Sequence, residues 1–126
     1  MNAKAIEIKQ GLQLFHGSEH LYRIPLLRTR YTEGIKYLAK SADCYWLVTD
    51  ASVIAKSLMN RSRFITVDFK RFSPEEAESQ GYSAAITYSD GNGNTFEVHN
   101  YHVTDFPLDE LRLFFVDDTL LLPSEY

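Results

Sequence analysis

The chain has 126 residues, of which 44% are hydrophobic, 24% charged and 13% aromatic, a globular composition that excludes a disordered or fibrous protein. This length fits one domain over residues 1–126. The net charge of −4 hides two opposed halves, because residues 1–72 hold 12 of the 13 lysines and arginines but 6 of the 17 acidic residues. That distribution leaves +6 in residues 1–72 and −10 in residues 73–126. Since summed charge steers association over long range, the asymmetry favours a role in binding partners.

The first half is predicted to be helical. A first helix is indicated by apolar residues at helical spacing, Ala5, Ile8, Leu12 and Phe15. Thr32 can cap a second helix, in which apolar residues recur from 35 to 42. Two interpretations of the next segment stay open. Either Asp43 caps a helix that runs to Leu58, or residues 44–49 form a strand and Asp50 caps a shorter helix.

From residue 64 the apolar period changes to two, which predicts strands. Ser73 and Glu76 form a capping box for one short helix that ends at Gly81. Residues 90–93 supply the turn of a hairpin, and a phase slip predicts a β-bulge near His99. The stretches with strand character are 64–70, 82–88, 96–103, 111–115 and 120–122. The predicted fold is α+β, with N-terminal helices packed on one face of a four- to five-stranded antiparallel sheet.

Residues 22–31 are the main candidate for a binding surface. They contain Tyr22, Arg23, Arg28, Arg30 and Tyr31 around a proline. Arginine binds carboxylates and phosphates through two parallel hydrogen bonds, and tyrosine stacks on flat groups. These residues are therefore partner- or phosphate-binding candidates. Ordinary solvated charges, or pairing with the acidic half within the fold or a homodimer, are the alternatives. A protein partner is favoured over nucleic acid because the net charge is negative.

A short run, His16-Gly17-Ser18, resembles the start of ADP-ribosyltransferase domains. The resemblance implies that His16 binds a ribose of a nicotinamide cofactor, and Glu97 or Glu110 would then be the catalytic carboxylate. This gives an alternative function, a nucleotide- or NAD-binding protein or enzyme. The preferred interpretation of the run is a solvated turn between a helix and a strand.

No catalytic set, metal site or cofactor site is predicted. His16 and His20 are four residues apart, but Gly17 argues against a helix that would bring them together, and no third ligand is near. Cys44 is the only cysteine, so no intramolecular disulfide forms and a small buried side chain is expected. The sequence contains no apolar signal-peptide run and no stretch long enough to span a bilayer, which predicts a cytoplasmic protein without a membrane role.

Several segments together resemble a family of small bacterial proteins described only as a domain of unknown function. The most specific are residues 31–39, which read YTEGIKYLA, and residues 121–126, which read LLPSEY. The other segments are 45–47, 90–94 and 104–110. The resemblance implies a bacterial, plasmid or phage setting and provides no catalytic residue. The leading hypothesis is therefore a non-enzymatic protein-interaction module that works through residues 22–31 and the acidic half.

Overall fold

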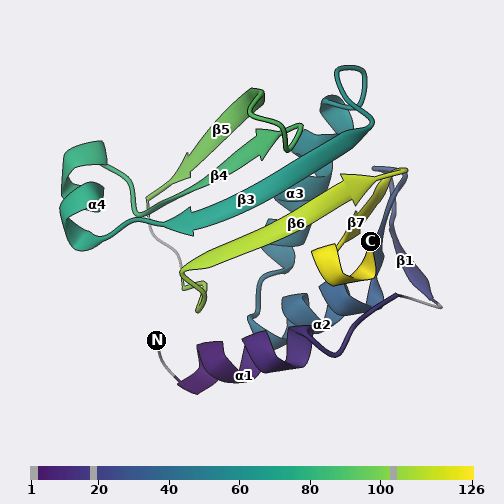
Figure 1. Ribbon diagram of the computed structural model, residues 1–126, viewed down its shortest axis with the longest axis horizontal. Coiled ribbons are helices and arrows are strands. Elements are labelled where there is room, and N and C mark those ends of the chain that lie inside the picture. Colours follow the sequence, from purple (N-terminus) through teal and green to yellow (C-terminus); the bar gives the residue numbers. More distant parts are fainter. Residues whose placement is uncertain (1–2, 18–19, 103–104) are drawn as a thin grey trace.

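A computed structural model describes residues 3–17, 20–102 and 105–126 and shows an α+β fold (Figure 1). The described residues do not include Ser18 of the His-Gly-Ser run, Val103 of one predicted strand, or Thr104 of one resembling segment. The helices are α1 (Ala3–Leu12), α2 (Glu33–Ser41), α3 (Tyr45–Ser57), α4 (Pro74–Gln80) and a 3-10 helix, η1 (Pro123–Glu125). The strands are β1 (Leu21–Ile24), β2 (Thr29–Thr32), β3 (Phe64–Arg71), β4 (Ala84–Ser89), β5 (Thr95–Tyr101), β6 (Glu110–Val116) and β7 (Thr119–Leu121).

The seven strands form one mixed sheet in the order β1-β2-β7-β6-β3-β4-β5. Neighbouring strands pair antiparallel except β2 and β7, which run parallel. The prediction of four to five antiparallel strands was therefore wrong. The basic segment forms two further strands, and β2 can run parallel to β7 because a long crossover separates them in sequence.

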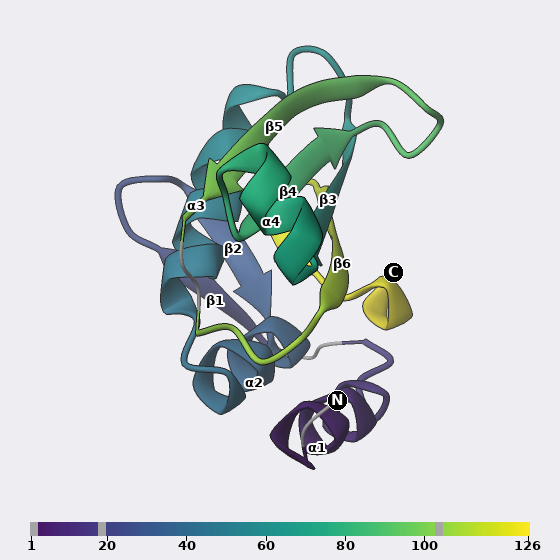
Figure 2. The same cartoon turned by 90° about the vertical axis from the view of Figure 1, so that its left-hand side faces the viewer.

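Helices α2 and α3 cover one face of the sheet, and α1 packs against α2 (Figure 2). The core face carries alternate residues of β3, Ile65, Val67 and Phe69, together with Leu113 and Phe115 of β6. One continuous cluster of buried side chains joins this face to the helices. The expectation that helices of the first half pack on one sheet face is confirmed for α2 and α3.

Several predicted helix boundaries are confirmed, but the first helix ends at Leu12 although its apolar pattern continued to Phe15. Thr32 caps α2, because its Oγ1 accepts a hydrogen bond from the amide of Ile35. Residues 45–49 belong to α3, so the helical interpretation of this segment is correct. Asp43 does not cap that helix. It adopts a left-handed conformation, with φ of 50°, in the link from α2. Cys44 takes the cap position, and its thiol donates to the Leu38 carbonyl and does not cap α3.

In the second half, the capping box of Ser73 and Glu76 and the C-cap at Gly81 are present as predicted. The hairpin of β4 and β5 is also confirmed, but its register shift lies between Tyr88 and Ser89 and not near His99. The apolar phase slip that suggested the later position has another cause, because Val98 lies on the exposed side of β5 whereas Tyr101 is half-buried. Within the described part of the chain, no helix has the length and apolar character needed to cross a membrane.

Ion pairs join the basic and acidic halves of the sequence within the fold. Four connect a cation of residues 1–72 to a carboxylate of residues 73–126, namely Arg30–Asp117, Lys56–Asp118, Lys70–Glu76 and Arg71–Asp109. In a fifth, Asp68 of β3 binds Arg112 of β6 through two hydrogen bonds of 2.7 and 3.2 Å. Part of the charge asymmetry is therefore neutralised inside the molecule.

Candidate functional site at the β1–β2 hairpin

The basic segment folds as a hairpin at one edge of the sheet. Tyr22 pairs with Tyr31 and Arg23 pairs with Arg30 across β1 and β2. Because successive side chains of a strand point to opposite faces, the two tyrosines lie on one face and the two arginines on the other. The candidate residues predicted together from sequence are thus divided between two sides of the hairpin.

The tyrosine pair packs toward α2. The Tyr22 and Tyr31 rings stack with centroids 5.4 Å apart, and the Lys36 ammonium lies 4.2 Å from the Tyr22 ring centre. Burial raises the pKa of Tyr31 above its ordinary value. Both rings are half-buried, and neither lines the pocket described next. Their contacts are those of packing between the hairpin and α2.

The arginine face is only partly neutralised. Arg30 donates a hydrogen bond to the Asp117 carbonyl at 2.8 Å, and its guanidinium lies 3.6 Å from the Asp117 carboxylate. Arg23 and Arg28 are exposed, and neither side chain forms a hydrogen bond or ion pair with another residue of the described ranges. The hairpin therefore presents two guanidinium groups that the described fold does not use.

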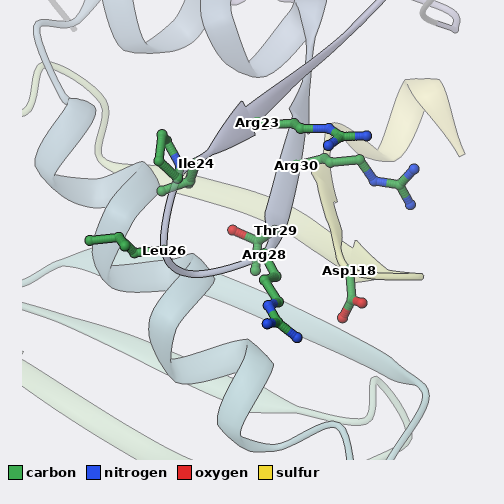
Figure 3. Close-up of a pocket in the computed structure, with 8 residues that line it drawn as sticks. Arg23, Ile24, Leu26, Arg28, Thr29, Arg30 and Asp118 are labelled. Atoms are coloured by element: carbon green, nitrogen blue, oxygen red, sulfur yellow. The ribbon is translucent and has the colours of Figure 1, made fainter.

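All three arginines line a pocket of about 390 Å³ at the tip of the hairpin. Figure 3 shows the Arg23 and Arg30 side chains side by side and pointing the same way, whereas Arg28 extends from the turn on the side of Asp118. Lys56 holds Asp118 through a contact of 2.8 Å. The remaining lining residues are Ile24, Pro25, Leu26 and Thr29. Leu26 is 100% exposed and adopts a φ of 74°, which is uncommon for a residue with a side chain.

His16 does not line this pocket. It is exposed and follows α1 in an irregular segment, in agreement with the predicted turn. No group of three or more residues suited to hold a metal occurs among the residues that the structure describes. Cys44 is buried as expected, and burial raises the pKa of its thiol to about 12, so the reactive thiolate is disfavoured near neutral pH.

A second group of polar and aromatic residues lies between α3 and β5. Tyr101 donates a hydrogen bond to Asp50 at 3.3 Å, and its ring lies 5.5 Å from that of Trp46. On the same strand, His99 and Glu97 are 2.8 Å apart. Sequence reasoning missed this group because its members are distant in the chain. One signal was available in the sequence. Trp46 and Asp50 are four residues apart, which places them on the same face of a helix.

The family model for DUF6876, described as a family of unknown function, matches residues 6–126. The chain belongs to this family. The resemblance recognised in the sequence is thereby confirmed. Comparison of the DUF6876 chain with curated proteins and with solved structures finds no match.

The two most specific resembling segments meet in this DUF6876 chain. The Glu125 carboxylate accepts hydrogen bonds from the Thr32 hydroxyl at 2.6 Å, the Gly34 amide at 3.3 Å and the Leu122 amide at 3.0 Å. A side chain at position 34 would overlap Leu122 and Glu125, so glycine gives the C-terminal segment room to approach. This contact gives both segments a structural role.

Proposed function

We propose that the protein is a non-enzymatic interaction module that binds an acidic segment of a partner protein through the β1–β2 hairpin. The observation that carries the proposal is the presence of Arg23 and Arg28, exposed and without an ion pair in the described structure, beside the wholly exposed Leu26. Free cations select carboxylates and raise the rate of encounter, and an exposed apolar side chain supplies contact area.

A protein partner fits the hairpin better than nucleic acid does. Nucleic-acid binders neutralise many phosphates at once, and their basic residues cover a broad face. Here Arg30 already contacts Asp117, Lys56 contacts Asp118, and the net charge is −4. The remaining free cations of the pocket suit one or two carboxylates. We also propose a bacterial host and carriage by a plasmid or phage, on the basis of the sequence resemblance alone. A cytoplasmic location is proposed as well, in keeping with a single cysteine that is buried as a free thiol.

The nucleotide-binding alternative has weaker support. It requires His16 at a ribose and the arginines at the phosphates, and His16 is not among the residues that line the arginine pocket. Calorimetric titration with NAD and a nucleotide panel tests it directly. Heat of binding that disappears in both a His16→Ala and an Arg28→Ala variant would favour this alternative over the interaction module.

The proposal is tested by comparing partner capture by two charge-reversal variants in nuclease-treated bacterial lysate. Arg23→Glu with Arg28→Glu changes the pocket, and Lys9→Glu with Arg63→Glu makes the same net change at exposed residues elsewhere. We expect the hairpin variant to lose a captured protein at least about tenfold, because like charges repel an acidic partner. The control variant should retain that protein.

A Leu26→Asn variant tests whether Leu26 contributes to the affinity for the partner without contributing to the stability of the fold. Asparagine tolerates the left-handed conformation of position 26 better than leucine does, so stability should be kept or raised. We expect the affinity for the identified partner, measured by calorimetry, to fall because the apolar contact is lost. Equal capture by the hairpin variant, the control and the wild type would refute the proposed surface.

A further inference from the structure

A pocket of about 480 Å³ lies at the junction of α1, α3 and the segment after β5, away from the hairpin. Trp46 and Tyr101 both line it, with their rings tilted by 55° to one another. Phe106, which is buried, is a further lining residue of the pocket. Trp46, the only tryptophan in the chain, is 37% exposed. Two inclined aromatic rings at a pocket offer π faces that attract a cation.

Carboxylates surround these rings. Asp43 and Asp105 line the pocket, are exposed, and form no ion pair with any residue of the described ranges. Asp50 does not line the pocket, but it accepts a hydrogen bond from the Tyr101 hydroxyl and so places a further negative charge next to that tyrosine. Lys4 of α1 is the cation that lines the same pocket. Negative groups therefore outnumber the positive one, which favours a cationic occupant.

We propose that this Trp46–Tyr101 pocket binds an arginine side chain presented by a partner protein. A guanidinium group stacks on aromatic rings and pairs with carboxylates through its five N–H donors, and so matches the two rings and the two exposed carboxylates of the pocket. Lysine lacks the flat surface and has fewer donors. The pocket shares no lining residue with the hairpin, and the inference is independent of the function proposed for that surface.

The fluorescence of Trp46 gives a direct readout, because no other tryptophan contributes. The full chain is titrated with the peptide acetyl-Gly-Arg-Gly-amide, and with the same peptide containing citrulline, a neutral side chain of the same shape. We expect a saturable change with the arginine peptide and a Kd on the order of 1 mM, as fits a single anchoring residue. The citrulline peptide should bind at least about fivefold more weakly because it lacks the charge.

Variants assign the binding to this pocket. Asp43→Asn with Asp105→Asn should weaken arginine binding about threefold to tenfold, since two exposed carboxylates are neutralised. Glu75→Gln with Glu78→Gln makes the same charge change on α4 and should leave binding unaltered. Lys4→Ala should bind the peptide about twofold more tightly, because a competing charge is removed.

Two results would overturn the proposal: equal responses to the arginine and citrulline peptides, or wild-type binding by the Asp43→Asn, Asp105→Asn variant. A silent fluorescence titration, confirmed by the absence of binding heat in calorimetry, would overturn it as well.

Discussion

Gly11 shows how one residue sets the approach of two helices. A Cβ at this position of α1 would overlap the ring and hydroxyl of Tyr37 on α2, whose ring lies 5.5 Å from that of Phe15. A glycine to alanine change in a helix normally stabilises by about 1 kcal/mol. At Gly11 we expect the opposite, a loss of about 1–3 kcal/mol in the free energy of unfolding measured in urea, because Tyr37 must move.

A double-mutant cycle isolates this effect. In a Tyr37→Ala background the space beside α1 is open, so Gly11→Ala should become neutral or stabilising. If Gly11→Ala were stabilising in the wild-type background too, the close packing of α1 on α2 would be refuted. The expected coupling follows from contact between the two positions.

Among the elements, the C-terminal segment, residues 121–126, is bonded to the start of α2 through Glu125. Glu125 accepts two hydrogen bonds there, from the Gly34 amide and from the Thr32 hydroxyl that caps the helix, and a third from Leu122 of its own segment. A carboxylate at a helix N-terminus also interacts favourably with the helix dipole. We expect Glu125→Ala to lower the free energy of unfolding by about 1–3 kcal/mol in urea denaturation, because partly buried donors lose their acceptor.

Ser124→Ala is the matched control, since this neighbouring residue is exposed and should change stability by less than about 0.5 kcal/mol. Glu125→Gln should fall between the two, because the amide keeps one acceptor oxygen and loses the charge. If Glu125→Ala had the same free energy of unfolding as the wild type, Glu125 would not stabilise the start of α2.

Elements specified by local signals were predictable from the sequence, and those specified by distant partners were not. The capping box at Ser73 and the hairpin turn at residues 90–93 are written within a few adjacent residues. In contrast, β1 and β2 have four residues each, flank a proline-containing turn and join the sheet through β7, far along the chain. Their tyrosines and arginines indicated a binding surface. The same residues also alternate as in a strand, but no strand was predicted from that pattern.

The same distinction applies to the candidate sites. Arg23, Arg28 and Arg30 were found together because they are close in sequence, and the fold places all three at one pocket. Their tyrosine neighbours point the other way, since strand geometry separates adjacent side chains. The Trp46–Tyr101 pocket could not be predicted, because it depends on how α3 crosses β5.

For the whole molecule, the fold determines how much of the charge asymmetry remains for binding. The five ion pairs between the halves involve side chains that are at least 32% exposed. Exposed pairs contribute little to stability, and salt screens them. We therefore expect the free energy of unfolding to change by less than about 1 kcal/mol between about 0.02 and 0.5 M NaCl.

Partner binding should respond to salt far more strongly. The free guanidinium groups of Arg23 and Arg28 lie at the hairpin pocket, and attraction to an acidic partner over long range is screened within about 10 Å at 0.1 M salt. Parallel urea denaturation and affinity measurements across the same salt series compare the two effects. A loss of several kcal/mol in stability would contradict this division, because it would mean that the opposed halves serve to hold the fold together. A stable fold with salt-sensitive association instead assigns the unneutralised charges to recognition.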